Sequence, residues 1–379
     1  MKPLLEYASR SSLIVNILAT LIGISSNRHS ELKHALQSRS IIPIMAILIG
    51  IRFRKLARKV TDPLARNARR IFGNTKKSDL AAASERPVLN EVGSFGENDS
   101  RRALLLPPVS NDGPFPKVIF QTWKSRVSIP FNYAQWSESF KRTNPDFEYF
   151  LWDDFDNRRF IETYYPWFLP VYDAYPREIY RADAVRYFFL YQFGGLYADM
   201  DTECLRPVAP LFESGDVWLG RMGTDSDFPH SIPNAIMASR PLQEFWLLAI
   251  HILVENARTQ GNLEAMISSG PEAMTGLIVL KRTYDTYMSS GRSAVREKIQ
   301  GIAMRLPDNL QPQPKASKVE LLEPDIFYPI DWSNILHLRL SCEVVDFKLM
   351  LGERTKRWLF PRSFLVTYWT HSWKAPTQK

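Results

Sequence analysis

The chain has 379 residues, of which 45% are hydrophobic and 23% charged, a composition typical of a folded globular protein with one or two domains. Its net charge of +8 is unevenly distributed. Residues 1–79 hold 15 Lys and Arg against 4 Asp and Glu, a net of +11, so the other 300 residues carry about −3. The basic run is not interleaved with a recognisable nucleic-acid-binding module, so no nucleic-acid partner is expected.

Residues 1–76 form a basic, partly hydrophobic leader that predicts association with a membrane. Ser12–Ser26 is an apolar run that is short for a span of roughly 20 residues, so a cleaved signal peptide and a signal-anchor both stay open. Ile41–Ile51 is shorter still and contains Pro43, and the eight Arg and Lys of Arg52–Arg70 then resemble a basic membrane-surface helix. If Ile41–Ile51 spanned, the positive-inside tendency would place this basic flank in the cytosol, so the leader does not settle an orientation.

Residues 77–113 are rich in Ser, Asn, Glu and Pro without a sustained period and predict a flexible stem, which carries the glycosylation sequon at Asn98. The two cysteines, Cys204 and Cys342, could form one disulfide in an oxidising lumen or stay as two buried thiols.

Residues 114–379 alternate strand and helix patterns, which predicts a parallel α/β sheet. In such sheets ligands collect at the carboxyl ends of the strands, where Gln121, Trp123, Asp153 and Asp154 fall. The expected strands are Lys117–Trp123, Phe147–Trp152, Leu196–Asp201, Val217–Gly220, Asn234–Ser239 and Val319–Ile330, before a closing segment, Phe364–Lys374. The expected helices surround Trp136 and Phe140, cover 157–172 with breaks at Pro166 and Pro170, and follow at Pro241–Asn256 and from Gly270-Pro271 to Tyr287, while 288–318 shows little pattern.

The stretch Arg177–Pro207 carries the strongest functional signal. A helical period places Asp183 and Arg186, three residues apart, on one face, and Gly194-Gly195 then ends the helix. The next residues predict a strand through Asp199 and Asp201, whose side chains would point to the same side. Two carboxylates at a strand end beside an Asp and an Arg suit a divalent cation that holds a diphosphate.

The spacing D-x-D alone is weak, because it occurs three times in the chain. Asp154/Asp156 and Asp225/Asp227 lie among polar or turn-forming neighbours, which favours solvated loops. Only Asp199/Asp201 is framed by a helix, a Gly-Gly pair and an apolar strand, and this context favours a metal site.

Several motifs occurring in order resemble the fungal glycosyltransferase family 32, which includes initiating α-1,6-mannosyltransferases and inositol-phosphoceramide mannosyltransferases. The resemblance covers about Pro116 to Lys374. Its motifs are PKVIFQTWKS, TNPDFEYFLWDD, YRADAVRYFFLYQFGGLYADMDTECLRP, PNAIMAS, SGPEAMTG and a terminal Ser-Trp. The resemblance implies a GT-A type, Rossmann-like nucleotide-sugar-binding fold with a mixed, mostly parallel sheet, a GDP-mannose donor, Mn²⁺ (or Mg²⁺), and a Golgi membrane setting with a lumenal catalytic domain.

The same resemblance implies roles for individual residues. Asp201 would bind the metal directly, and Asp199 would contact the water shell of the metal or the donor ribose. Asp183 and Arg186 would hold the donor sugar and its phosphate, and Gln121 and Trp123 would line the nucleotide.

The end of the chain departs from the family pattern His-x-Trp-x-x-Ser-Trp, whose histidine can complete the metal shell. Alignment on Ser372-Trp373 puts Thr367 at that position, whereas alignment on a single His-x-Trp puts His371 there. His371 is favoured as the third ligand because an imidazole nitrogen binds metals far better than a threonine hydroxyl.

The predicted function is therefore metal-dependent transfer of a hexose, most simply mannose from GDP-mannose, to a glycan or glycolipid acceptor with retention. The chain stops after the catalytic region, whereas ceramide-directed members often continue with hydrophobic segments, which tilts the expectation away from a sphingolipid acceptor. Two alternatives stay open: a catalytically weak membrane-tethered partner of another glycosyltransferase, and a haloacid-dehalogenase-type phosphatase, which Glu203 disfavours because that chemistry reads D-x-D-x-T/V.

Overall fold

The computed structural model describes residues 113–334, 336, 337, 340 and 352–370, together with positions 15, 19, 24, 28, 30–32 and 48. The predictions for the rest of the leader, the stem and its sequon, Cys342 and His371 lie outside the described residues. The chain divides into two compact units, 94–330 with 362–379, and 1–93 with 331–361. In the second unit, helix α16 covers Glu353–Leu359. The first unit, 94–330 with 362–379, carries the D-x-D motif.

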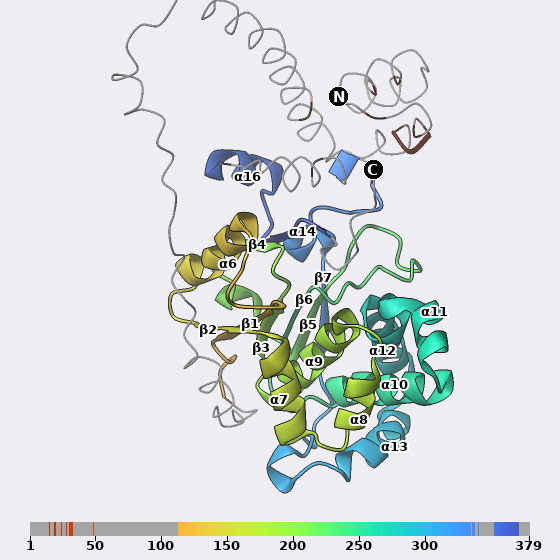
Figure 1. Cartoon of the computed structure of the whole chain (residues 1–379). Coiled ribbons are helices and arrows are strands. Elements are labelled where there is room, and N and C mark those ends of the chain that lie inside the picture. The colour runs from red at the N-terminus through yellow and green to blue at the C-terminus, as the bar shows by residue number, and fades with distance from the viewer. Residues whose placement is uncertain are drawn as a thin grey trace, which may run out of the picture. The chain divides into compact units, whose positions relative to one another are not determined.

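A six-stranded sheet forms the centre of this unit, in the order β2-β1-β3-β6-β5-β7 (Figure 1). β1 pairs in parallel with β2 and β3, and β5 pairs in parallel with β7, while β6 runs antiparallel to β3 and β5. The sheet is therefore mixed and mostly parallel, and the predicted α/β class is confirmed. The strands are β1 (Val118–Thr122), β2 (Glu148–Trp152), β3 (Gly195–Ala198), β5 (Val217–Gly220), β6 (Ile236–Ser239) and β7 (Val319–Leu322).

Helices cover both faces of the sheet, as the alternation of side chains along the strands requires. Phe120 and Phe150 point to one face, where the Phe120 ring lies 5.5 Å from that of Phe189 on helix α9 (Glu178–Gln192). Tyr149 points to the other face, where its hydroxyl contacts that of Ser137 on helix α6 (Phe131–Thr143). The strands thus separate two layers, and the motif-bearing helix α9 belongs to the first.

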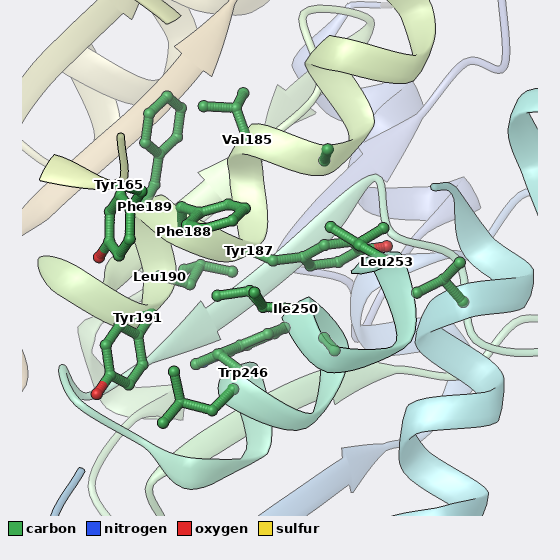
Figure 2. Close-up of a cluster of buried hydrophobic side chains, with 14 of the residues drawn as sticks. Tyr165, Val185, Tyr187, Phe188, Phe189, Leu190, Tyr191, Trp246, Ile250 and Leu253 are labelled. Carbon is green, nitrogen blue, oxygen red and sulfur yellow. The ribbon is translucent and has the colours of Figure 1, made fainter. Parts of the chain in front are cut away.

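Helix α9 is buried on nearly all sides, because every residue from Asp183 to Gln192 lies in the interior. Figure 2 shows its side chains packed against Trp246, Ile250 and Leu253 of helix α10 (Glu244–Gln260), with the Tyr187 and Trp246 rings stacked at 6.0 Å. This burial carries the polar residues of α9 into the core together with the aromatic ones. The other helices are α7 (Asp154–Tyr164), α8 (Leu169–Ala174), α11 (Leu263–Met274), α12 (Leu277–Ser289), α13 (Arg292–Ala303) and α14 (Pro324–Phe327), with short 3₁₀ turns at Ala209–Leu211 and Asp308–Leu310.

A second, two-stranded sheet joins the centre of the chain to its end. β4 (Thr202–Cys204) pairs antiparallel with β8 (Leu365–Thr367), in the register Thr202↔Thr367 and Cys204↔Leu365. All six residues are buried. Cys204 is a free thiol, and burial raises its pKa to about 12.

The structure corrects several expected boundaries. The segment 288–318, which shows little pattern, contains helix α13, whose buried Val295, Ile299 and Ile302 do recur at a helical spacing. Val319–Ile330 is a strand only as far as Leu322 and then turns into α14. The break expected at Pro166 separates α7 from α8, but Pro170 breaks no helix, because it lies in the first turn of α8.

Within the part of the chain that the structure describes, we find no helix with the length and apolarity needed to cross a bilayer.

Candidate active site

Asp199 and Asp201 lie in a turn and not on a strand, so the predicted strand through Asp201 is wrong. β3 ends at Ala198, and the Thr202 amide donates to the Asp199 carbonyl at 3.0 Å, which closes a turn before β4 begins. The two carboxylates therefore do not share a face through strand alternation. They lie at the carboxyl end of β3, the position at which α/β sheets collect their ligands.

Arg186 on α9 joins the predicted site residues, and its exposed fraction is only 3%. One terminal nitrogen, Nη2, lies 2.8 Å from Asp183 Oδ1, and the other, Nη1, lies 3.2 Å from Asp199 Oδ1. Nη1 also donates to the Asn234 carbonyl at 2.7 Å, and the guanidinium stands over the Tyr197 ring at 4.6 Å. The pair Asp183/Arg186 is thus more than a local helix pair, because it extends to the first carboxylate of the D-x-D motif.

Two residues that sequence reasoning missed complete this network. The Tyr197 hydroxyl donates to Asp199 Oδ1 at 2.9 Å, and the Asn234 amide Nδ2 donates to Asp183 Oδ1 at 3.1 Å. Asn234 lies just before β6 in the segment PNAIMAS, whereas the sequence predicts a strand that begins at Asn234. Tyr197 could have been predicted from its position on β3, two residues before Asp199.

Gln121 and Trp123, the predicted nucleotide-lining residues, behave differently. Gln121 is fully buried: its Nε2 donates to the Asp199 carbonyl at 3.0 Å, and its Oε1 accepts from the Tyr149 hydroxyl at 2.6 Å. It therefore holds the backbone of the D-x-D turn. Trp123 is partly exposed, donates to the Ser128 carbonyl at 3.3 Å and packs its ring 4.6 Å from that of Tyr133. Contact of either side chain with a nucleotide stays a prediction.

Asp201 is held by the C-terminal segment. Its Oδ2 accepts from the Thr370 amide at 2.8 Å and from Thr370 Oγ1 at 2.9 Å, and its carbonyl accepts from the Tyr368 amide at 2.9 Å. Thr367, one of the two registers for a third ligand, is 1% exposed, and its hydroxyl lies 3.1 Å from that of Thr202. The favoured register, His371, lies outside the described residues.

Three carboxyl groups thus gather around one guanidinium. Burial raises the pKa of Asp183 and of Asp199 to about 6, against the opposing effect of Arg186, and burial also raises the pKa of Asp201. When all three are ionised, the site carries more negative than positive charge. Such an excess favours the binding of a cation.

The donor set fits a divalent cation. Asp199 uses Oδ1 for its contacts with other residues and Asp201 uses Oδ2, so within the described residues no other residue donates a hydrogen bond to Asp199 Oδ2 or to Asp201 Oδ1. Two hard oxygens are the ligands that Mn²⁺ or Mg²⁺ takes from a protein that shares the ion with a diphosphate. No group of three His, Cys, Asp or Glu side chains suited to a metal occurs within the described ranges.

The other two D-x-D pairs have structural roles. Asp156 lies in the first turn of α7, where its Oδ2 accepts from the Asp153 amide at 3.1 Å and its own amide donates to Asp153 Oδ1 at 3.0 Å. Asp156 therefore caps α7 together with Asp153, and both Asp154 and Asp156 lie in the first turn of the helix, whereas a loop was expected. Asp225 and Asp227 do lie in a loop, in which the Asp227 amide donates to Asp225 Oδ1 at 2.9 Å.

Comparison with known proteins agrees with the resemblance inferred from the motifs. Residues 130–220 match a family model described as a glycosyltransferase sugar-binding region containing a DXD motif. The chain is 38% identical over 217 residues to inositol phosphoceramide mannosyltransferase 2 of Schizosaccharomyces pombe, over 55% of this chain and 60% of that protein. It is 40% identical over 158 residues to inositol phosphoceramide mannosyltransferase 3 of the same organism, over 41% of this chain and 42% of that protein.

A relative from the other branch of the resemblance matches as well. The chain is 36% identical over 118 residues to the initiation-specific alpha-1,6-mannosyltransferase of Candida albicans, over 30% of this chain and 31% of that protein. The matches to the two ceramide-directed relatives span between about two fifths and three fifths of their length. Among solved structures, the PaToxG glycosyltransferase aligns at 14% identity with a TM-score of 0.35, over 56% of this chain and 83% of that chain, which is too low to support an argument.

Proposed function

Since residues 130–220 belong to the glycosyltransferase sugar-binding regions that contain a DXD motif, we propose that the chain is a metal-dependent mannosyltransferase. It takes mannose from GDP-mannose and transfers it, with retention of the anomeric configuration, to a glycolipid. We further propose that it adopts the GT-A type of fold and works at the Golgi membrane with its catalytic unit in the lumen.

The observation that carries this proposal is the buried link from Arg186 to both Asp183 and Asp199, which lies two residues before Asp201 in the motif. An ion pair of this kind on the surface would be weak evidence for function, since it contributes only about 0–1 kcal/mol to the stability of a fold. Here the guanidinium is almost fully buried beside carboxylates at the end of a strand. Burying a cluster of charged side chains costs free energy. Such a cluster at the carboxyl end of a strand, where α/β sheets bind their ligands, therefore favours a functional role.

The chemistry that the site must perform is stabilisation of a leaving diphosphate. A divalent cation, held by Asp201 and Asp199 and, as we propose, by His371, would supply positive charge to the phosphate oxygens. Arg186 adds a fixed guanidinium beside Asp199, whose positive charge would attract a phosphate oxygen. Tyr197 and Gln121 keep Asp199 in place through its carboxylate and its carbonyl, so little reorganisation is needed when charge develops.

Asp183 is suited to bind a hydroxyl of the transferred sugar. Its Oδ1 is occupied by Arg186 and Asn234, whereas its Oδ2 has no hydrogen bond within the described residues. Gly276 faces this oxygen: a Cβ built there would lie 3.0 Å from Asp183 Oδ2. The glycine therefore keeps open the side from which a hydroxyl group would donate.

The relatives favour a glycolipid over a glycan as the acceptor. The two inositol phosphoceramide mannosyltransferases match longer stretches than the initiation-specific alpha-1,6-mannosyltransferase, 217 and 158 residues against 118. We therefore favour a glycolipid acceptor. An acceptor whose hydrocarbon tail stays in a bilayer also agrees with the membrane association expected of the leader.

A panel of nucleotide-sugars tests the proposal on the full chain. GDP-mannose, UDP-galactose and UDP-N-acetylglucosamine are supplied with Mn²⁺ or with a chelator, and release of the nucleoside diphosphate is measured with and without inositol phosphoceramide. We expect Mn²⁺-dependent turnover of GDP-mannose that the lipid accelerates. If only a UDP-sugar is turned over, GDP-mannose is not the donor. Release of phosphate from a generic phosphate monoester, without transfer of a sugar, would favour the phosphatase alternative.

A further inference from the structure

The segment Tyr368–Thr370 contacts Asp201 more closely than any other described part of the chain, although 169 positions separate Thr370 from it. Both donors of Thr370, its amide and its hydroxyl, reach the same carboxylate oxygen, at 2.8 and 2.9 Å. The Tyr368 amide holds the Asp201 carbonyl at 2.9 Å. Residues of the C-terminal segment therefore hold both the backbone and the side chain of Asp201.

The segment is itself anchored by the two residues that precede Thr370. The Tyr368 hydroxyl donates to Glu203 Oε2 at 2.7 Å, and its ring stacks on Trp136 at 4.7 Å. The Trp369 indole donates to the Ile330 carbonyl at 2.6 Å, and its ring stacks on Tyr328 at 5.5 Å. These contacts fix both aromatic side chains through residues other than Asp201.

Trp369 has a backbone φ of +50°, in the left-handed region. This conformation is unfavourable for a bulky residue and costs of the order of 1–3 kcal/mol unless the surroundings determine it. Trp369 lies two residues after the end of β8 and directly before Thr370. Its strained conformation therefore precedes the residue whose amide and hydroxyl both contact Asp201.

We propose that Thr370 is a positioning residue for the metal ligand Asp201. Its two hydrogen bonds to Oδ2 fix the rotation of the carboxylate and would leave Oδ1 as the oxygen available to a cation. The C-terminal segment is thereby part of the metal site, through a residue that neither the D-x-D motif nor the terminal Ser-Trp motif contains. This inference rests on the proposed function, because it assumes that Asp201 binds a cation.

Substitution of the hydroxyl tests the inference on the full chain. Thr370→Val keeps the shape and the backbone amide but removes one donor, whereas Thr370→Ser keeps both donors and is the matched control. The dissociation constant for Mn²⁺ is measured by electron paramagnetic resonance of the free ion, with and without GDP. Because loss of a hydrogen bond to a metal ligand weakens metal affinity by about 10–100-fold, and the amide still donates, we expect about 10-fold weakening for Thr370→Val. For Thr370→Ser we expect the wild-type constant.

Steady-state kinetics provide the second measurement. The apparent KM for Mn²⁺ in GDP-mannose hydrolysis should rise in Thr370→Val by the same factor, while kcat at saturating Mn²⁺ should return to near the wild-type value. A buried anchor substitution, Thr202→Val, removes the contact with Thr367 but not a bond to Asp201, and should leave the Mn²⁺ constant unchanged in folded protein.

Two outcomes overturn the inference in distinguishable ways. If Thr370→Val binds Mn²⁺ like wild type while Asp201→Asn does not bind it, the positioning role is wrong and the proposed function stands. If the wild-type chain binds no Mn²⁺ with or without GDP, the metal-dependent function fails, and the positioning role fails with it.

Discussion

At the scale of single residues, the character of the site depends on how Arg186 is held. Its guanidinium contacts two carboxylates and two carbonyls from three different elements, α9, the D-x-D turn and the loop before β6. The sequence predicted the pair Asp183/Arg186 and the carboxylates, because their types and spacings are visible along the chain. It did not predict Asn234, Tyr197 or Thr370, because a hydrogen bond between distant segments leaves no periodic signal.

Arg186→Lys should lower turnover of the donor by about 10²–10³-fold, the cost of removing one preorganised donor at a developing charge. Lysine keeps the charge but cannot contact Asp183, Asp199 and the Asn234 carbonyl through one planar group. The measurement is kcat/KM for GDP-mannose hydrolysis with Mn²⁺. The control, Arg158→Lys, alters an exposed arginine that pairs with Asp173 at 2.8 Å, and should change kcat/KM less than threefold. Equal effects of the two substitutions would show that Arg186 has no special role.

Binding of Mn²⁺ should weaken as the pH falls through about 6. The pKa of Asp199 is raised to about 6 by burial, so below that pH the carboxyl group holds a proton that must leave before a cation can bind. The dissociation constant should be nearly constant above pH 7 and should rise by up to about tenfold per unit below pH 6.

Titration of Mn²⁺ from pH 5 to pH 7.5 measures this dependence. The variant Asp199→Asn should bind more weakly at pH 7 and show a smaller dependence on pH. A dissociation constant that stays unchanged from pH 5 to pH 7.5 in the wild type would exclude Asp199 as a titrating ligand.

At the scale of the elements, the Gly-Gly pair determines where the carboxylates emerge. Gly194 and Gly195 have φ of +66° and +84°, so the helix ends and β3 begins within two residues. The sequence predicted this turn because glycine is the residue that adopts such angles readily. It overestimated the length of the strand, since nothing local distinguishes a strand from a turn at Asp199; the Gln121 amide and the Thr202 amide, both bound to the Asp199 carbonyl, favour the turn.

Gly195→Ala should destabilise the fold by about 2–4 kcal/mol, the sum of left-handed strain and overpacking. A Cβ on Gly195 would lie 2.6 Å from the Val118 carbonyl oxygen, on the neighbouring strand β1. The measurement is the urea midpoint of tryptophan fluorescence.

Gly261→Ala is the matched control for that substitution. Gly261 also has a positive φ, +64°, but its nearest neighbour to an added Cβ is 3.9 Å away. We expect a cost of about 1 kcal/mol, from backbone strain alone. If both variants unfolded at the same urea concentration, close packing of β1 against Gly195 would not be the cause.

At the scale of the whole unit, the site is assembled from residues between Gln121 and Thr370 by the sheet order and by the pairing of β4 with β8. The alternation of strands and helices predicted the parallel part of the sheet around β1, β2 and β3. The reversal of β6 was not predictable, because an antiparallel partner looks the same in sequence as a parallel one when both faces are buried. The pairing of β8 was equally hidden, since three residues define it.

Turnover by Asp201→Ala tests the central claim most directly, namely that the D-x-D turn at the end of β3 holds a cation for a leaving diphosphate. The control is Asp227→Ala, which disrupts the D-x-D spacing of the exposed loop. With Mn²⁺ and GDP-mannose supplied to the full chain, and with folding checked by circular dichroism, we predict that Asp201→Ala lowers kcat by about 10²–10³-fold or more and that Asp227→Ala changes it less than twofold. Transfer by Asp201→Ala at the wild-type rate would contradict the account.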